Sequence, residues 1–166
     1  MKLRGPFVYQ ITVEEGDRYS VLSPQGKSNF VAPVTTRGPK IYVFAHENSL
    51  IYIGQTVQGM SARMRLGFKA NGTGGYWGYR WRRDLEESAL HIWVLEDCSE
   101  EDEFHALECI ESEVVYLYRS TFDQWPKFQT EIHFHESNQA HRALARQIFD
   151  GFREESINKA MSATSA

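Results

Sequence analysis

Two short runs of β-branched and aromatic residues stand close together in the first half of the chain. Residues 40–44 read KIYVF and residues 50–54 read LIYIG, with the mostly polar segment AHENS between them. Such a pattern is typical of a β-hairpin. A loop of three or five residues would place Tyr42 directly opposite Tyr52, with both hydroxyl groups on one face of the sheet. The opposite face would carry the aliphatic side chains of the two runs, Ile41, Val43, Ile51 and Ile53.

A helix with two arginines is expected directly after the hairpin, where residues 59–68 read GMSARMRLGF. At about 100° per residue, Arg63 shares a helical stripe with Met60 and Met64, whereas Arg65 points the other way. A guanidinium on the inner side of a helix can donate two hydrogen bonds to a phosphate in fixed geometry. Arg63 is therefore the candidate phosphate ligand. The alternative is an ordinary half-exposed arginine on an amphipathic helix.

A second helix is expected over residues 103–118, with a glutamate on its apolar face. Glu111 falls in the middle of this face, whereas Glu113 points nearly opposite and Glu108 lies at the edge. An unpaired buried carboxylate is costly, so this one must be protonated, ion-paired or bound to a metal. An ion pair with a buried arginine such as Arg63 thus remains open beside a metal site. The apolar residues that define the face are Phe104, Leu107, Val114, Val115 and Tyr118.

With these residues in this order, residues 39–136 resemble the catalytic domain of the GIY-YIG nucleases. This superfamily cleaves DNA phosphodiester bonds and uses a divalent metal. The first family motif stands here as Lys40-Ile41-Tyr42, and the second as Tyr52-Ile53-Gly54. Lys40 replaces the glycine of the family, which we expect to change the entry into the strand and not the chemistry.

The resemblance implies a metal-dependent DNA endonuclease with four catalytic residues, Tyr42, Tyr52, Arg63 and Glu111. Glu111 would be the metal ligand and would hold one divalent cation, Mg²⁺ or Mn²⁺. Tyr42 would deprotonate the attacking water, Arg63 would stabilise the growing charge on the phosphorane, and Tyr52 would orient the phosphate. Some restriction enzymes of the family lack a separate targeting domain, as we expect here. The alternative is a non-catalytic nucleic-acid-binding module with the same fold.

Two groups that are frequent in the family are missing. Many members have a histidine one turn after the arginine, where this chain has Gly67 and Phe68. Members also often have an asparagine beyond the glutamate, and the nearest amide here is Gln129, an auxiliary candidate. These departures favour the non-catalytic alternative, whereas the tyrosines, Arg63 and Glu111 favour a nuclease.

Alternating polar residues end the region of resemblance. Glu131, His133 and His135 would share one face if they lie on a strand. They could form a three-ligand transition-metal site, or simply a polar strand face. The sequence around them supplies no cysteine or further histidine to complete a tetrahedral site, which favours the polar face. His133 is a second auxiliary candidate for the nuclease site.

The segment 63–83, called the basic segment below, contains basic residues and no acidic one. Aromatic residues alternate with the basic ones around the glycine-rich stretch 71–75. This composition is typical of phosphate contacts combined with packing against bases or sugars. The alternative is a solvated loop whose aromatic side chains return to the core. Besides Arg63, the candidates for nucleic-acid binding are Arg65, Lys69, Arg80, Arg82 and Arg83.

These elements predict an α+β fold with a small three-stranded antiparallel sheet flanked by helices. Its strands would be the hairpin and residues 90–95. Residues 1–38 are expected to form an N-terminal β extension, with strand-like runs at 7–13, 19–22 and 30–34. Residues 39–136 would be the nuclease-like core and residues 137–166 a C-terminal helix and tail, all within one compact domain. The last helix would dock through an apolar stripe of Leu144, Ile148, Phe149 and Phe152.

Composition bears on how strongly the protein binds DNA and on its location in the cell. The chain has 166 residues, a formal net charge of −4 and two cysteines. The negative charge argues mildly against tight, indiscriminate DNA binding. Two isolated cysteines, without a signal peptide or an apolar membrane segment, are typical of a reducing cytoplasm and predict no membrane partner.

DNA is the expected partner, and a homodimer on DNA is expected for clean double-strand cutting. One active site hydrolyses one strand per visit, and antiparallel strands are related by a two-fold axis. The candidate interfaces are the aromatic residues of the basic segment and the apolar stripe of the last helix. That stripe could equally pack on its own core.

Overall fold

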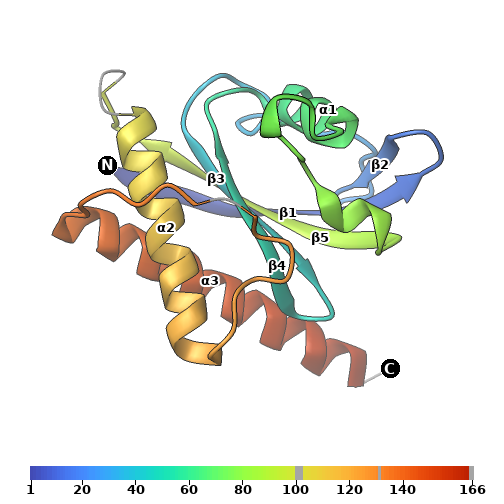
Figure 1. Ribbon diagram of the computed structural model, residues 1–166. Helices are drawn as coiled ribbons and strands as arrows, with labels where there is room; N and C mark the ends of the chain where they lie inside the picture. Colours follow the sequence, from blue (N-terminus) through green and yellow to red (C-terminus); the bar gives the residue numbers. More distant parts are fainter. Residues whose placement is uncertain (100–102, 131, 165–166) are drawn as a thin grey trace.

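A five-stranded antiparallel sheet is the centre of the computed structural model, which describes residues 1–99, 103–130 and 132–164 (Figure 1). Two short 3₁₀ turns, Thr73–Gly75 and Arg80–Arg83, lie between the first helix and the last strand. The regular elements are β1 (Lys2–Glu14), β2 (Arg18–Leu22), β3 (Lys40–His46), β4 (Ser49–Thr56), α1 (Met60–Lys69), β5 (Glu87–Glu96), α2 (Glu103–Phe122) and α3 (Gln139–Thr164).

The predicted α+β class is confirmed, but the sheet has five strands and not three. Its order is β2-β1-β5-β3-β4, so the three expected strands form one side of the sheet. β1 pairs with β5 from Lys2 to Thr12, so the N-terminal strands continue the same sheet. This pairing covers an edge of β5 that would otherwise expose unpaired backbone groups.

The third strand-like run, residues 30–34, is not a strand. Pro33 cannot donate a ladder hydrogen bond, and the backbone forms turns here, with Val34 N–H bonded to the carbonyl of Val31. The side chains of Phe30 and Val34 are nevertheless buried against the sheet. The apolar pattern of this run therefore reflects burial in a loop.

Each face of the sheet has its own layer. In Figure 1, α2 and α3 lie on one face and α1 lies on the other, together with the green segment that follows it. The first face buries the apolar stripe of α3 against Trp93 and the aliphatic side chains of β3. The second face is largely aromatic, and its buried side chains include Tyr42, Phe44, Tyr52, Phe68, Tyr79 and Trp81.

The hairpin register differs from the predicted one. Glu47 and Asn48 have φ of 47° and 63° and form a two-residue turn between His46 and Ser49. β4 then has one extra residue, Ile51, because Ala45 faces Leu50 whereas Phe44 faces Tyr52. The predicted direct pairing of the two tyrosines is therefore wrong.

The bulge does not change the face of the sheet on which the two tyrosines lie. Tyr42 faces Gly54, two positions beyond Tyr52, so both tyrosines still project from one face of the sheet. The bulge rotates Ile51 onto the same face, where the sequence had placed it opposite. Only Ile41, Val43 and Ile53 of the four expected aliphatic side chains pack against α2 and α3.

Lys40 is fully buried at the start of β3. Its ammonium group donates hydrogen bonds to the carbonyls of Thr36 (2.7 Å), Gly38 (2.7 Å) and Gln58 (3.1 Å). The lysine therefore joins the segment that enters β3 to the segment that leaves β4, on the way to α1.

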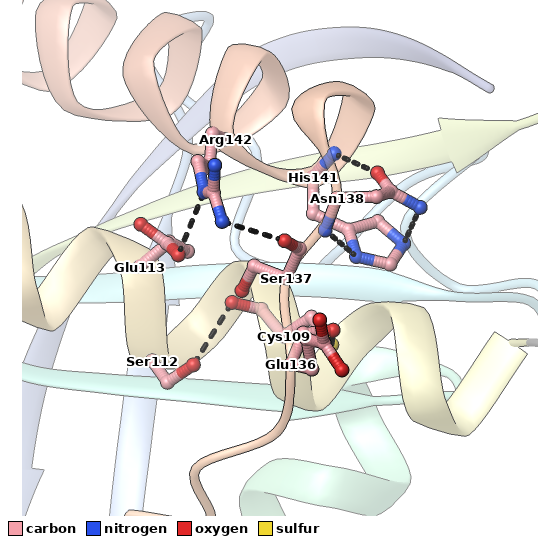
Figure 2. A network of polar contacts seen from close by, with 8 residues as sticks. All are labelled: Cys109, Ser112, Glu113, Glu136, Ser137, Asn138, His141 and Arg142. Atoms are coloured by element: carbon pink, nitrogen blue, oxygen red, sulfur yellow. Dashed lines mark hydrogen bonds and ion pairs between the residues drawn. The ribbon is translucent and has the colours of Figure 1, made fainter.

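A polar network joins α2 to the start of α3 (Figure 2). Arg142 lies 3.5 Å from the Glu113 carboxylate and donates to the carbonyl of Ser137 at 2.7 Å. The side chain of Asn138 accepts the His141 backbone N–H at 2.9 Å, which caps the first turn of α3. Glu113 therefore faces α3 and not open solvent, contrary to the sequence-based expectation. No helix in the described part of the chain is long and apolar enough to cross a membrane.

Candidate active site

Tyr42 and Tyr52 are brought together by adjacent strands. Their rings stack with centroids 6.4 Å apart and an angle of 30° between the planes. Gly54 lies opposite Tyr42 on β4, and a Cβ at this position would collide with the Tyr42 hydroxyl group. The glycine of the Tyr52-Ile53-Gly54 motif is thus needed for the Tyr42 side chain to lie flat across the sheet.

Arg63 reaches this pair from α1. Its Nε donates a hydrogen bond of 2.8 Å to the Tyr42 hydroxyl oxygen, and its guanidinium carbon lies 5.4 Å from the centre of the Tyr76 ring. Met60 and Met64 are fully buried, so this stripe of α1 faces the sheet as the sequence predicts. Arg65 is exposed and points away from the tyrosines, near Tyr19. Of the two arginine candidates, Arg63 therefore contacts the tyrosines.

The guanidinium of Arg63 keeps its positive charge in this environment. Burial by itself would lower the pKa of Arg63, but the surrounding tyrosine oxygens, with Tyr42 foremost, outweigh it and raise that pKa above its ordinary value. Burial, with smaller contributions from Tyr42 and Glu111, raises the pKa of Tyr52 well above its usual range. The site therefore presents a fixed cation beside a neutral phenol.

Glu111 approaches the same place from α2, which packs along β4. The residue is partly buried, and its negative charge is one of the smaller causes that raise the pKa of Tyr52. Phe104 is 54% exposed and does not belong to the buried face of α2, contrary to the prediction. The other predicted positions, Leu107, Val114, Val115 and Tyr118, are buried, and Glu111 lies between them on the helix.

Gln129 lies at the outer edge of β4. Its side-chain oxygen accepts the backbone N–H of Ile53 at 2.9 Å, so the amide is held beside the second motif. His133 is exposed on the segment that leads to α3. The structure thus places Gln129 beside the second motif and His133 on the exposed segment before α3.

His133 and His135 of the alternating set do not lie on a strand. Residues 132–138 have no regular secondary structure, and Glu131 lies outside the described residues. The His135 ring pairs with Glu108 of α2 at 2.7 Å. Among the described residues, no three His, Cys, Asp or Glu side chains are arranged to hold a metal ion.

The basic segment divides between the core and the surface. Phe68, Tyr79 and Trp81 are fully buried, whereas Tyr76 and Trp77 are 38% and 43% exposed. Phe68, Tyr79 and Trp81 therefore return to the core, as in one of the two alternatives, whereas Tyr76 and Trp77 stay accessible to solvent.

Its arginines divide in the same way. Arg80 and Arg83 are exposed and lie 5.6 Å and 6.0 Å from the Trp77 ring centre. The side chain of Arg82 is only 6% exposed and bonds to Asp17 and to the carbonyls of Ala70 and Tyr79. Lys69 is exposed at the end of α1.

Tyr79 contacts the site, although in the sequence it is only one of several aromatic residues of the basic segment. Its hydroxyl donates to the Tyr42 hydroxyl oxygen at 3.2 Å. The available signal was Gly67, a glycine inside a helix one turn after Arg63, which indicates a close approach by another part of the chain.

The arrangement suits a phosphate more than a stand-alone metal site. One carboxylate, one fixed guanidinium and several phenols meet here, and Mg²⁺ commonly binds through one or two carboxylates, waters and the phosphate of its substrate. A single glutamate is therefore compatible with a cation that binds together with the substrate.

Comparison with models of known protein families, with curated proteins and with solved structures finds no match to this chain. The resemblance to the GIY-YIG nucleases therefore rests on the sequence motifs alone.

Proposed function

We propose that this chain is a divalent-metal-dependent endonuclease that hydrolyses phosphodiester bonds in DNA. The observation that carries the proposal is the hydrogen bond from Arg63 Nε to the Tyr42 hydroxyl oxygen, beside Tyr52 and Glu111. Four elements supply these residues: β3 and β4 carry the tyrosines, α1 the arginine and α2 the glutamate. Their order along the chain is the order in the GIY-YIG nucleases.

Each side chain has a role that follows from its chemistry. Arg63 is a permanent cation next to the bound phosphate and stabilises the charge that grows on the phosphorane. Tyr52 stays neutral and donates a hydrogen bond to a phosphate oxygen. Tyr42 first loses its own proton to solvent and then, as the phenolate, takes the proton of the attacking water, directly or through a second water.

Glu111 is the residue that would hold Mg²⁺ or Mn²⁺. A divalent cation supplies Lewis-acid stabilisation of the phosphate and of the leaving oxygen. The residue lies on α2, which packs against β4, the strand that carries Tyr52.

The exposed part of the basic segment is the proposed DNA contact. Trp77 lies against Arg80 and Arg83, and Tyr76 lies against Arg63, so the exposed aromatic pair connects the surface arginines with the site. Arg65 and Lys69 add charge on the outer side of α1. Arg82 is bonded within the chain and is left out of this surface.

Cleavage of supercoiled plasmid in Mg²⁺ or Mn²⁺ tests the proposal. We expect nicked or linear product from the wild-type chain, none from Glu111→Gln, and a rate lower by about 100-fold or more from Arg63→Ala, as for other lost transition-state contacts. Glu108→Gln is the matched control, because Glu108 lies on the same helix but pairs with His135. It should cut at the wild-type rate.

The outcomes also separate the alternative function. Binding of DNA without cleavage in either metal would favour a non-catalytic nucleic-acid-binding module. Full activity of Glu111→Gln would contradict the role of Glu111, and a large loss of stability in that variant would favour a buried ion pair.

A further inference from the structure

Tyr79 has no place in the four-residue site described above, yet it is the buried group in closest contact with it. Its side chain is fully buried among Tyr42, Phe44, Tyr52, Phe68 and Trp81. A phenylalanine would fill this aromatic environment equally well. Burying a hydroxyl group costs free energy unless the group is hydrogen-bonded. The hydroxyl of Tyr79 therefore points to a role beyond packing.

That hydroxyl bonds to the centre of the proposed site. Tyr79 donates to the Tyr42 hydroxyl oxygen at 3.2 Å, and Arg63 Nε donates to the same oxygen at 2.8 Å. A phenolic oxygen has two lone pairs, so these two donors occupy both of them. The proton of Tyr42, whose side chain is itself fully buried, is then directed away from both donors.

The direction of the bond is fixed by the burial of Tyr79. Burial, followed by the influence of Tyr42, raises the pKa of Tyr79 well above its usual range, so this hydroxyl keeps its proton. Tyr79 remains a donor when negative charge develops on the Tyr42 oxygen. Such a donor favours the charged form of its partner.

The backbone holds Tyr79 in register with α1. Its N–H donates to the carbonyl of Gly67 at 3.2 Å, and Arg82, three residues later, donates to the carbonyl of Ala70 at 3.0 Å. Both carbonyls lie at the end of α1 and lack partners within the helix. The same helix that carries Arg63 therefore positions Tyr79.

Gly67 completes this arrangement. It lies one turn after Arg63, and a Cβ there would collide with the Tyr79 ring. A glycine in a helix interior costs about 1 kcal/mol relative to alanine. This cost is explained by the position of the Tyr79 ring, which occupies the space that a larger side chain at Gly67 would need.

We propose that Tyr79 is a positioning residue of the active site, which holds the Tyr42 hydroxyl by a hydrogen bond and enters through the space left by Gly67. The proposal rests on the proposed nuclease function for its kinetic consequence. The hydrogen bond itself can be tested without any activity.

The kinetic test compares Tyr79→Phe with Tyr9→Phe in metal-dependent cleavage of a DNA oligonucleotide. Tyr9 is the matched control, because it is buried in the same aromatic layer and its hydroxyl accepts the Val31 N–H, away from Tyr42. We expect Tyr79→Phe to lower kcat by about 10- to 100-fold, the range of one hydrogen bond to a charged group, with KM within about twofold. Tyr9→Phe should leave both constants unchanged.

The spectroscopic test observes the ¹³Cζ resonance of Tyr42 at neutral pH in protein labelled on tyrosine, assigned with Tyr42→Phe. This carbon reports on hydrogen bonding to the phenolic oxygen. We expect it to shift in Tyr79→Phe and not in Tyr9→Phe. Gly67→Ala should displace the Tyr79 ring and shift the same resonance, and should add little to the kcat loss when combined with Tyr79→Phe.

The two proposals can fail separately. A wild-type protein that cuts DNA, with unchanged kcat in Tyr79→Phe, would overturn the role of Tyr79 alone. An unchanged Tyr42 resonance in Tyr79→Phe would do so even if no cleavage were found. A wild-type protein that cuts nothing, with the resonance shifted as expected, would overturn the nuclease and keep the hydrogen-bond arrangement.

Discussion

At the scale of single residues, the site depends on positions where a side chain is missing. Gly54 leaves room for the Tyr42 hydroxyl group, and Gly67 leaves room for the Tyr79 ring. Both glycines have ordinary backbone conformations, so space and not flexibility explains them. The polar atoms of the site can approach one another only because these two backbone positions carry no Cβ.

Gly54→Ala should therefore damage the site more than the fold. The new methyl group pushes the Tyr42 side chain away from Arg63, and we expect cleavage to fall at least about tenfold, with a loss of about 1–3 kcal/mol in the free energy of unfolding. The measurements are plasmid cleavage and urea unfolding. Gly151→Ala in α3 is the control, because its nearest neighbours lie 3.7 Å away. It should keep full activity, and a Gly54→Ala protein that also kept it would contradict the geometry described for Tyr42.

Lys40 predicts a pH dependence of stability. Burial, with the nearby Arg37 adding to it and Glu103 opposing it, lowers the pKa of Lys40 from 10.5 to about 8. Between about pH 8 and 10.5 the unfolded chain holds this proton and the folded chain does not. The free energy of unfolding should therefore rise with pH in this window, relative to a protein without the lysine.

The experiment compares urea unfolding of the wild type and Lys40→Met at pH 7, 9 and 10. The variant leaves the carbonyls of Thr36, Gly38 and Gln58 without their donor, so we expect it to be less stable throughout. The difference between the two proteins should grow from pH 8 to 10. Parallel curves would show that Lys40 keeps its charge through the bonds to these carbonyls.

At the scale of the elements, the sequence predicts which face of a strand or helix a side chain occupies better than it predicts which residues that side chain contacts. Alternation in the strands places Tyr42 and Tyr52 on one side of the sheet, and helical periodicity turns Arg63 toward it. The bulge at Ile51 could not be predicted, because it depends on a long-range partner: the Phe128 N–H bonds to the Ile51 carbonyl. The contact of Tyr79 depends in the same way on how the basic segment returns along α1.

The basic segment illustrates this limit for charged residues. Arg80, Arg82 and Arg83 are close together in the sequence. The side chain of Arg82 donates a hydrogen bond to the carbonyl of Ala70 at the end of α1, whereas Arg80 and Arg83 lie on the surface around Trp77. No periodicity distinguishes them, because the segment turns through short 3₁₀ elements instead of one regular helix. Their functions must therefore be separated by experiment.

We expect Arg80→Ala combined with Arg83→Ala to weaken DNA binding and to flatten its salt dependence. If each arginine neutralises one phosphate, the slope of log affinity against log salt should fall by about 1.8 units in total. Arg146→Ala with Arg153→Ala is the charge-matched control on α3, across the sheet. Fluorescence anisotropy with a labelled duplex at several salt concentrations provides both slopes. Equal slopes for the two double variants would indicate that the DNA contact does not lie around Trp77. Residues 1–38 would then be the next candidate surface.

At the scale of the whole molecule, the sheet separates the two helical layers. The face covered by α2 and α3 buries the apolar stripe Leu144, Ile148, Phe149 and Phe152, so this stripe stabilises the chain itself and is removed as a dimer interface. The face covered by α1 carries the tyrosines, and Glu111 lies on α2, which packs against β4. Exposed aromatic side chains near the site, Tyr76 and Trp77, remain available to a partner.

The last prediction concerns assembly on DNA. The proposed site has one set of catalytic residues and cuts one strand, whereas the two strands of a duplex are related by a two-fold axis. Clean double-strand cutting therefore requires two chains arranged symmetrically, and we expect linear plasmid as the product together with two chains per duplex. Sedimentation velocity of the Glu111→Gln protein on a short duplex measures the stoichiometry without cleavage. Nicked plasmid as the sole product, with one chain bound per duplex, would instead indicate an enzyme that acts on a single strand, and the exposed Tyr76 and Trp77 would then serve DNA contact alone.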